Sequence, residues 1–202
     1  MKKGILLLPP ESRDRIYGTE NLRAMRELID LTDCSELTGD LDALRPALSE
    51  TEIICSGWGM MPLDAEFLAA APNLRAVFYG AGSVRGFATD EFWKRDILLT
   101  SAWAANAIPV AETTVAMMVL GLKNAFESRR LTRLERTWVK AKPMRGMYGA
   151  RIGVIGVGKI GRKVLQLLQD YDVELYCHDP YMAEETARVY WFSVNWTYRS
   201  ST

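Results

Sequence analysis

Short apolar runs alternate with longer amphipathic segments over the first hundred positions of this chain. Apolar runs of four to eight residues that end near Gly, Pro or Trp are typical of buried strands. We expect such strands at 4–10, 27–33, 51–58, 74–82 and 96–103. The intervening segments have helical spacing and are expected at 12–26, 38–49, 63–71 and 88–95. This alternation predicts an α/β fold in which crossover helices cover both faces of a parallel sheet.

Capping and breaking residues refine these limits. Thr89 or Asp90 is the expected N-cap of the helix before strand 96–103. The sequence NAIPVAETTVAMMVLGLKNAFES predicts a long interdomain helix over 106–128, with Pro109 in its first turn. A second helical stretch follows at 129–141. The first sheet is complete by about residue 103, so we expect one domain over 1–103 and another over 104–202.

The second domain contains a glycine pattern with a complete local context. Gly156, Gly158 and Gly161 match G-x-G-x-x-G, with the strand RIGVIG before the turn and the helix KIGRKVLQLLQDY after it. A further strand, VELYCHD, ends at Asp179, 18 positions beyond Gly161. These are the parts that a dinucleotide-binding βαβ unit requires.

Each residue of this unit has a predicted task. Gly156 permits the tight turn, Gly158 lets a pyrophosphate approach the backbone, and Gly161 lets the helix pack closely on the strand. The amides of Lys159 and Ile160 face the phosphates at the positive end of the helix. Asp179 accepts hydrogen bonds from the adenosine ribose and disfavours a 2′-phosphate, which predicts NAD as cofactor. The alternative is a plain glycine-rich turn beside a solvated carboxylate.

Composition narrows the class of protein and its compartment. Lys plus Arg and Asp plus Glu both number 25, so no net charge favours nucleic acid or anionic lipid. Cys34, Cys55 and Cys177 fit neither a disulfide framework nor a metal motif. The longest apolar run, Val115 to Leu122, is short of the roughly 20 residues of a membrane span. We therefore expect a cytoplasmic protein without metal, membrane or nucleic-acid contacts.

Three stretches together make the chain resemble the D-isomer-specific 2-hydroxyacid dehydrogenase family over roughly residues 1–185. They are VFYGAGSVRGF (77–87), NAIPVAETTVAMMVLGL (106–122) and GVIGVGKIGRKV with the later CHDP. The resemblance implies a flavodoxin-like substrate domain followed by a Rossmann NAD-binding domain that is incomplete here. It also implies that the long interdomain helix contributes to a homodimer.

The resemblance assigns the glycine loop after strand 74–82 to the substrate. The amides of Ala81 and Gly82 are expected to bind the carboxylate of a small 2-hydroxy or 2-oxo acid, and Ala81 is expected to lie close to the nicotinamide. Phe78 and the pair Ser83-Val84 depart from the family's commoner residues, which leaves the substrate open. The alternative is a strand-terminating turn in which Gly80 and Gly82 have positive φ.

The family's catalytic Arg, Glu and His all follow the ribose-binding acid, and only 23 residues follow Asp179 here. Those residues contain no His, and His178 lies inside the ribose-binding turn, so no catalytic residue is assigned. We expect a catalytically incomplete chain. The tail 187–202 is atypical and rich in aromatic residues, with a possible strand at 188–194. Truncation of a longer gene is the favoured explanation; an evolved short form with an aromatic interface is the alternative.

Three functions follow from these observations. The first is hydride transfer between NAD(H) and a small 2-hydroxy acid or its 2-oxo acid, as the resemblance implies. The second is a non-catalytic module that binds NAD or a carboxylate. The third is an oligomerising interaction protein in which the long helix and the aromatic tail contact a copy of the chain or a full-length relative.

Overall fold

A computed structural model describes residues 1–182 of the chain. The chain divides into two compact units, residues 1–106 and residues 107 onward. The expected limit at residue 103 lies three positions before this division, which falls inside a long helix. The segments predicted at 188–194 and 187–202 lie outside the described residues.

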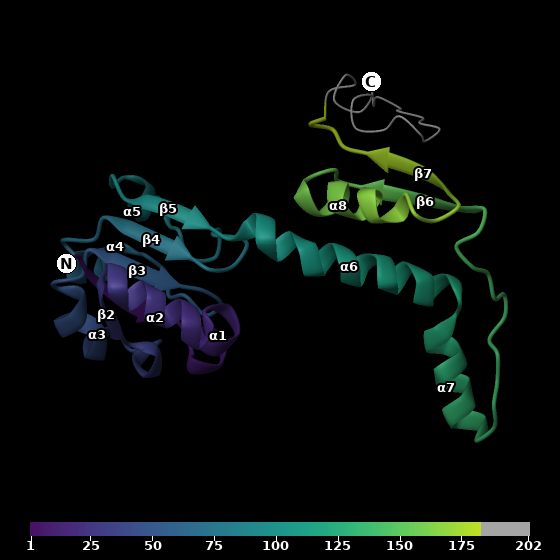
Figure 1. The fold of residues 1–202 in the computed structure, drawn as a ribbon, viewed down its shortest axis with the longest axis horizontal. Coiled ribbons are helices and arrows are strands. Elements are labelled where there is room, and N and C mark those ends of the chain that lie inside the picture. Colours follow the sequence, from purple (N-terminus) through teal and green to yellow (C-terminus); the bar gives the residue numbers. More distant parts are fainter. Residues whose placement is uncertain (183–202) are drawn as a thin grey trace. The chain divides into compact units, whose positions relative to one another are not determined.

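The first unit is built on a five-stranded parallel sheet in the order β2-β1-β3-β4-β5 (Figure 1). In this register Ile5 of β1 lies opposite Thr32 on one neighbour and Ile54 on the other. The prediction of an α/β fold with a parallel sheet is confirmed, and each strand is shorter than the apolar run that predicted it. The strands are β1 Lys3–Leu7, β2 Asp30–Asp33, β3 Ile53–Ser56, β4 Ala76–Tyr79 and β5 Leu98–Ser101.

Side chains of β1 alternate between two cores because successive strand residues point to opposite faces. Ile5 and Leu7 pack against three helices on one face, α3 Leu41–Leu48, α4 Ala65–Ala70 and α5 Asp90–Trp93. Leu6 and Leu8 pack on the other face against Leu22 of helix α2 (Gly18–Leu28) and against Ile16 and Tyr17 at the end of helix α1 (Pro10–Ile16). Helices therefore cover both faces of the sheet, as the alternation predicted.

Several expected helix limits are wrong for identifiable reasons. The helix expected at 12–26 is two helices, α1 Pro10–Ile16 and α2 Gly18–Leu28, because Gly18 has a φ of +63°. The second helix continues through Leu28, so strand β2 begins only at Asp30. A short 3-10 helix, η1 Ser35–Leu37, precedes α3. Thr89 is the N-cap of α5 and accepts a hydrogen bond from Phe92 N, as one of the two predicted positions.

The long helix also differs from its prediction. Helix α6 spans Trp103–Leu122 rather than 106–128, so Pro109 lies in its interior and not in its first turn. Asn124 adopts a left-handed conformation (φ +52°) and separates α6 from α7 Ala125–Glu135. Arg136 has the same left-handed φ and follows the last residue of α7, well before the expected end at 141.

The full length of α6 changes the membrane argument. Its 20 residues, with a mean hydropathy of 1.4 in the best window, meet the length and composition of a membrane span. Only 17% of that window is buried, although Ala111 and Val115 belong to the core of the second unit. The apolar run Val115–Leu122 alone therefore underestimated the length of this apolar helix, because polar residues such as Asn106 interrupt the run without ending the helix.

Among the described residues, the second unit has one parallel strand pair, β6 Ala150–Ile155 and β7 Val173–His178, joined through α8 Lys159–Leu168 (Figure 1). Ile152 and Val154 point to the core formed with α8 and α6. The alternate residues of β6 face away from that core, and Ile155 is 87% exposed.

Candidate nucleotide-binding site

The turn between β6 and α8 has the backbone that its glycines predict. Gly156 follows the strand directly and has a φ of +86°, a conformation that residues with a Cβ rarely adopt. Gly156 N donates to the carbonyl of His178 (2.8 Å), which fixes the start of the turn to the end of β7. The chain then reverses through Val157 and Gly158, and α8 begins at Lys159.

Gly161 is required by the packing of α8 on the strand. A Cβ built at this position would lie 2.0 Å from the carbonyl oxygen of Gly156 and 3.1 Å from its carbonyl carbon. Both are backbone atoms, so no side-chain rotation relieves the contact. The geometry agrees with the task predicted for this glycine.

The amino-terminal end of α8 is open in the way that an anion site needs. Gly158 is the N-cap, and a Cβ built there would meet no atom within 4 Å. Arg162 N donates to Gly158 O (3.0 Å), so the amides of Lys159 and Ile160 precede the first intrahelical hydrogen bond. Both residues are exposed. These amides and the helix dipole together favour a phosphate group at this end.

Asp179 lies directly after β7 and beside the turn. Its Oδ2 accepts a hydrogen bond from Val157 N (2.6 Å), and its Oδ1 accepts one from Tyr181 N (2.8 Å). These backbone hydrogen bonds lower the pKa of Asp179, with smaller contributions from His178 and Arg162. The carboxylate is therefore ionised at neutral pH, and each oxygen retains a lone pair for a ribose hydroxyl.

The structure adds two residues that sequence reasoning missed, Val157 and Arg162. Arg162 Nε donates to the carbonyl oxygen of Val157 (2.9 Å), so both backbone groups of Val157 are bound by charged side chains. Arg162 lies one helical turn after the Gly158 N-cap, and that spacing is the only sequence signal for the contact. His178 is exposed at the end of β7.

In the first unit, Ala81 and Gly82 lie at the carboxyl edge of the sheet, just after β4. Ala81 is fully buried, and a Cβ on Gly82 would approach Asn106 Nδ2 at 3.1 Å. Gly80 N donates to Ser56 O (2.8 Å), whereas within the described residues the Ala81 and Gly82 amides make no recorded backbone hydrogen bond. Two unpaired amides at this edge are compatible with a carboxylate ligand.

The alternative for this loop, positive φ at Gly80 and Gly82, is wrong. Neither glycine is among the described residues with positive φ. Gly80 is required for space instead, because a Cβ there would lie 2.4 Å from Ile16 Cγ2 and 3.3 Å from Tyr17 Oη. Tyr17 Oη donates to Ser56 O (2.8 Å) and so holds the end of α1 against the same edge.

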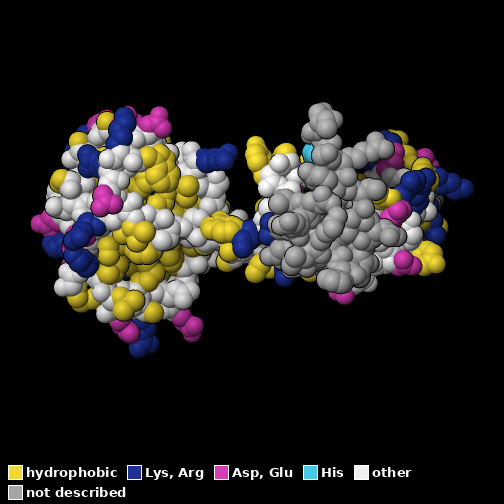
Figure 2. Space-filling model, turned by 90° about the horizontal axis from the view of Figure 1, so that it is seen from above, with side chains coloured by type: hydrophobic (Ala, Val, Ile, Leu, Met, Phe, Trp, Pro, Cys, Tyr) yellow, Lys and Arg dark blue, Asp and Glu magenta, His cyan; other side chains and the backbone are white. Residues whose placement is uncertain are grey.

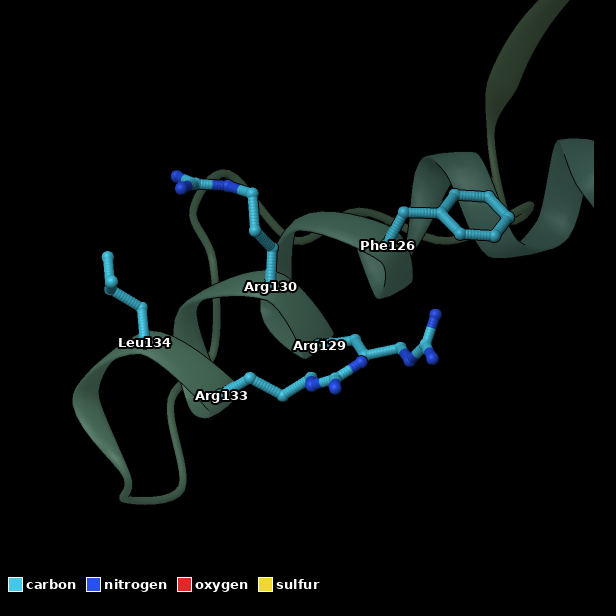
Figure 3. A pocket seen from close by; sticks show the side chains of 5 residues that line it. All are labelled: Phe126, Arg129, Arg130, Arg133 and Leu134. Atoms are coloured by element: carbon cyan, nitrogen blue, oxygen red, sulfur yellow. The ribbon is translucent and has the colours of Figure 1, made fainter.

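A separate concave surface lies along α7 and is strongly basic. Figure 3 shows its five lining residues, with Arg129 and Arg133 extending in the same direction and Arg130 away from them. Arg130 pairs with Glu127 (2.6 Å). Residues 123–145 hold eight Lys and Arg but two Glu, so a whole-chain net charge of zero conceals a local positive excess.

Taken together, the described part of the second unit is a βαβ unit with a glycine turn before its helix and a carboxylate at the end of its second strand, the arrangement that the sequence predicted. Residues 115–201 match the family model "D-isomer specific 2-hydroxyacid dehydrogenase, NAD binding domain". This part of the chain is therefore similar to the NAD-binding domain of the D-isomer-specific 2-hydroxyacid dehydrogenase family.

Curated relatives agree with this assignment. A D-3-phosphoglycerate dehydrogenase of Mycobacterium bovis is 28% identical over 150 residues, which are 73% of this chain and 28% of the relative. A glyoxylate reductase of Korarchaeum cryptofilum is 27% identical over 128 residues, 61% of this chain and 39% of the relative. The chain thus matches well under half of the length of either relative.

Solved structures share the fold over nearly the whole chain. A phosphoglycerate oxidoreductase from Rhizobium etli superposes with a TM-score of 0.70 at 19% identity, covering 98% of this chain and 61% of that structure. A D-lactate dehydrogenase from Aquifex aeolicus, solved with NAD and lactic acid, gives a TM-score of 0.66 at 20% identity over 96% of this chain and 55% of that one. At these identities the likeness concerns the fold.

Proposed function

We propose that this chain binds NAD through the turn between β6 and α8 and belongs to a system that transfers hydride between NAD(H) and a small 2-hydroxy acid or its 2-oxo acid. The observation that carries the proposal is the open α8 terminus at Gly158 with the ionised Asp179 beside it. In this proposal the units are a flavodoxin-like substrate domain and part of a Rossmann domain.

The described residues fit one part of the cofactor. Gly158 leaves room for the pyrophosphate, the amides of Lys159 and Ile160 would donate to it, and Asp179 would accept from the adenosine ribose. A carboxylate at this position disfavours the 2′-phosphate of NADP. The bound cofactor would supply the hydride. Ala81 and Gly82 would hold the carboxylate of the substrate through their amides.

Acid–base chemistry is not assigned to any described residue. Reduction of a 2-oxo acid needs a proton donor at the carbonyl oxygen, and the single histidine, His178, is an exposed residue of the ribose turn. The proposal is therefore a catalytically incomplete family member, and a non-catalytic NAD- or carboxylate-binding module is its nearest alternative. Free Cys34, Cys55 and Cys177 support a cytoplasmic location, which cell fractionation would test.

A titration of the whole chain with NADH tests the proposal, with energy transfer from the protein's tryptophans as the signal. We expect saturable transfer that Gly158→Asp removes, because the new carboxylate would occupy the pyrophosphate position. Gln166→Asp adds the same charge to the exposed side of α8 and should bind normally. Absence of binding by the folded wild-type chain would contradict the proposal.

Turnover separates the two functional alternatives. NADH oxidation would be followed with glyoxylate, pyruvate or hydroxypyruvate as substrate. NADH binding without turnover would support the module, whereas turnover that Gly158→Asp abolishes would support a complete enzyme.

A second candidate function is self-association, and exposed apolar side chains favour it. Helix α6 exposes large apolar side chains over its whole length, namely Trp103, Ile108, Val110, Met117 and Leu120. Figure 2 shows apolar side chains gathered on the surface of the first unit as well, where the exposed large ones include Leu28, Trp58, Phe78, Trp93 and Leu98. Surfaces of this kind mark interaction sites. We propose a homodimer through α6; a monomer at high micromolar concentration would contradict it.

A further inference from the structure

One residue of the phosphate-binding turn, Val157, is bound on both sides by charged groups. Its N–H donates to Asp179 Oδ2 at 2.6 Å, and its carbonyl oxygen accepts from Arg162 Nε at 2.9 Å. The two side chains come from different elements, the end of β7 and the first turns of α8. The Val157 peptide groups therefore connect the strand end, the turn and the helix.

These hydrogen bonds lie in a stretch of backbone whose residue types restrain it little. Val157 stands between Gly156 and Gly158, and glycine has the largest conformational freedom to lose on folding. A Cβ on either glycine would contact nothing within 4 Å, so no side-chain packing would restrain the turn at these two positions. The Val157 side chain is buried in the core of the second unit, and this burial anchors the middle of the turn.

The hydrogen bonds at Val157 are of the strong kind. Bonds in which one partner is ionised are shorter and roughly twice as strong as neutral ones. The two backbone donors, Val157 N–H and Tyr181 N–H, lower the pKa of Asp179, and the donor from Arg162 is a guanidinium nitrogen. Both contacts are made between residues of the chain itself.

We infer that Asp179 and Arg162 are positioning residues that hold the phosphate-binding turn in its binding conformation before NAD arrives. Asp179 then has two tasks, a structural one toward Val157 and the proposed one toward the ribose. The cofactor consequences of this inference depend on the proposed function, but the structural task is a property of the cofactor-free chain. Removing the carboxylate would therefore weaken NAD binding without creating NADP binding.

Hydrogen exchange of the Val157 amide in the cofactor-free protein tests the structural task. We expect Asp179→Ala to speed this exchange about tenfold or more, as the loss of a hydrogen bond to a charged group implies. Arg162→Met, which keeps the length of the side chain, should speed it by less, because the Asp179 contact remains. Asp170→Ala and Lys163→Met are matched controls on the same unit and should leave the exchange unchanged.

Comparison with global stability separates positioning from general support of the fold. Arg162→Met should keep the thermal midpoint of the wild type while Val157 exchange rises and NADH affinity falls. Asp179→Asn retains one acceptor oxygen and should fall between wild type and Asp179→Ala. Should Asp179→Ala fail to fold, these two variants still decide the question. Unchanged Val157 exchange in both would overturn the inference.

NADPH supplies the final comparison. If Asp179 acted only by repelling the 2′-phosphate, Asp179→Ala would gain NADPH affinity, and that result would also overturn the inference. We expect weaker NADH binding and no gain for NADPH. A wild-type chain that bound no NADH would contradict the proposed function, while the exchange measurement would still test the turn.

Discussion

The three glycines of the turn are required for different physical reasons. Gly156 is required by its positive φ, and Gly161 by a backbone oxygen 2.0 Å from where a Cβ would lie. Gly158 is restricted by neither, because the space around it is open. Substitutions at these positions should therefore separate stability from ligand binding.

Gly161→Ala should destabilise the second unit. Alanine gains about 1 kcal/mol over glycine inside a helix, but overpacking against rigid backbone costs typically about 1–3 kcal/mol and sometimes more. Since the contacts at 2.0 and 3.1 Å are both with backbone atoms of Gly156, which cannot rotate away, we expect the overpacking to exceed the helical gain. Denaturant unfolding would measure the difference, with Gly153→Ala, which meets no neighbour, as control. Equal stability of Gly161→Ala and wild type would refute the packing argument.

Acid should weaken the turn through Asp179. Its pKa is lower in the folded chain than in an unfolded one, because Val157 and Tyr181 donate hydrogen bonds to the carboxylate. A carboxylate whose pKa is lowered by folding contributes stability at pH values above its unfolded pKa of about 3.9. That stability is lost as the pH falls through the pKa of the folded state. Val157 exchange, corrected for its intrinsic pH dependence, should therefore rise below about pH 4. In Asp179→Asn the corrected exchange should show no such step.

At the scale of elements, strands were easier to predict than helix limits. The five strands of the first unit each fall within or overlap a predicted run. The inner strands β1 and β3 are mostly buried, which gives a continuous apolar signal, whereas the edge strands β2 and β5 are largely exposed. The ends of α1, α6 and α7 depend on single residues instead: Gly18, Asn124 and Arg136 leave the right-handed conformation for the left-handed one. Asn adopts this conformation more readily than most residues, whereas the residue type of Arg136 gives no signal for it.

In the candidate site, local features were likewise easier to predict than contacts between elements. The glycine spacing predicted Gly156, Gly161 and the open end of α8, because those demands are local. The contacts of Val157 with Asp179 and Arg162 depend on how the peptide plane is oriented within the turn, and that orientation follows from the packing of β7 beside β6. Side-chain type alone therefore did not indicate a role for Arg162.

Helix α4 should depend measurably on its cap. Asp64 Oδ1 accepts from Phe67 N (2.9 Å) at the N-terminus of this six-residue helix, whose Phe67 and Leu68 are buried in the first core. Asp64→Ala should lower the free energy of unfolding by about 1 kcal/mol, whereas Asp64→Asn, which retains an acceptor, should lower it by much less. Equal losses in the two variants would show that the hydrogen bond is not the cause.

At the scale of the whole molecule, charge is divided unevenly along the chain. Residues 1–106 hold 11 Lys and Arg against 16 Asp and Glu, a net charge of −5, and residues 107–202 hold 14 against 9, a net charge of +5. Attraction between opposite charges on two copies would be screened by salt, whereas apolar contacts would not. Salt therefore distinguishes two ways in which copies could associate.

We expect self-association through α6 to persist at high salt. Met117 is 51% exposed on this helix, and Met117→Glu would place a charge in the proposed apolar contact. The dimer should weaken about tenfold, equivalent to about 1.4 kcal/mol, as measured by sedimentation at low and high NaCl. Leu28→Glu makes a comparable change on the first unit and should have little effect. Loss of the wild-type dimer on adding salt would favour charge attraction instead.

The two paired strands β6 and β7 have a consequence for how heat would act on the protein. Within the described residues these two strands depend on the core that they form with α6 and α8, because two paired strands alone are marginally stable in water. A ligand that binds only the folded form adds about 2.7 kcal/mol when present at a hundred times its dissociation constant. If the chain binds NAD as proposed, the second unit should therefore unfold at a higher temperature as the NADH concentration rises.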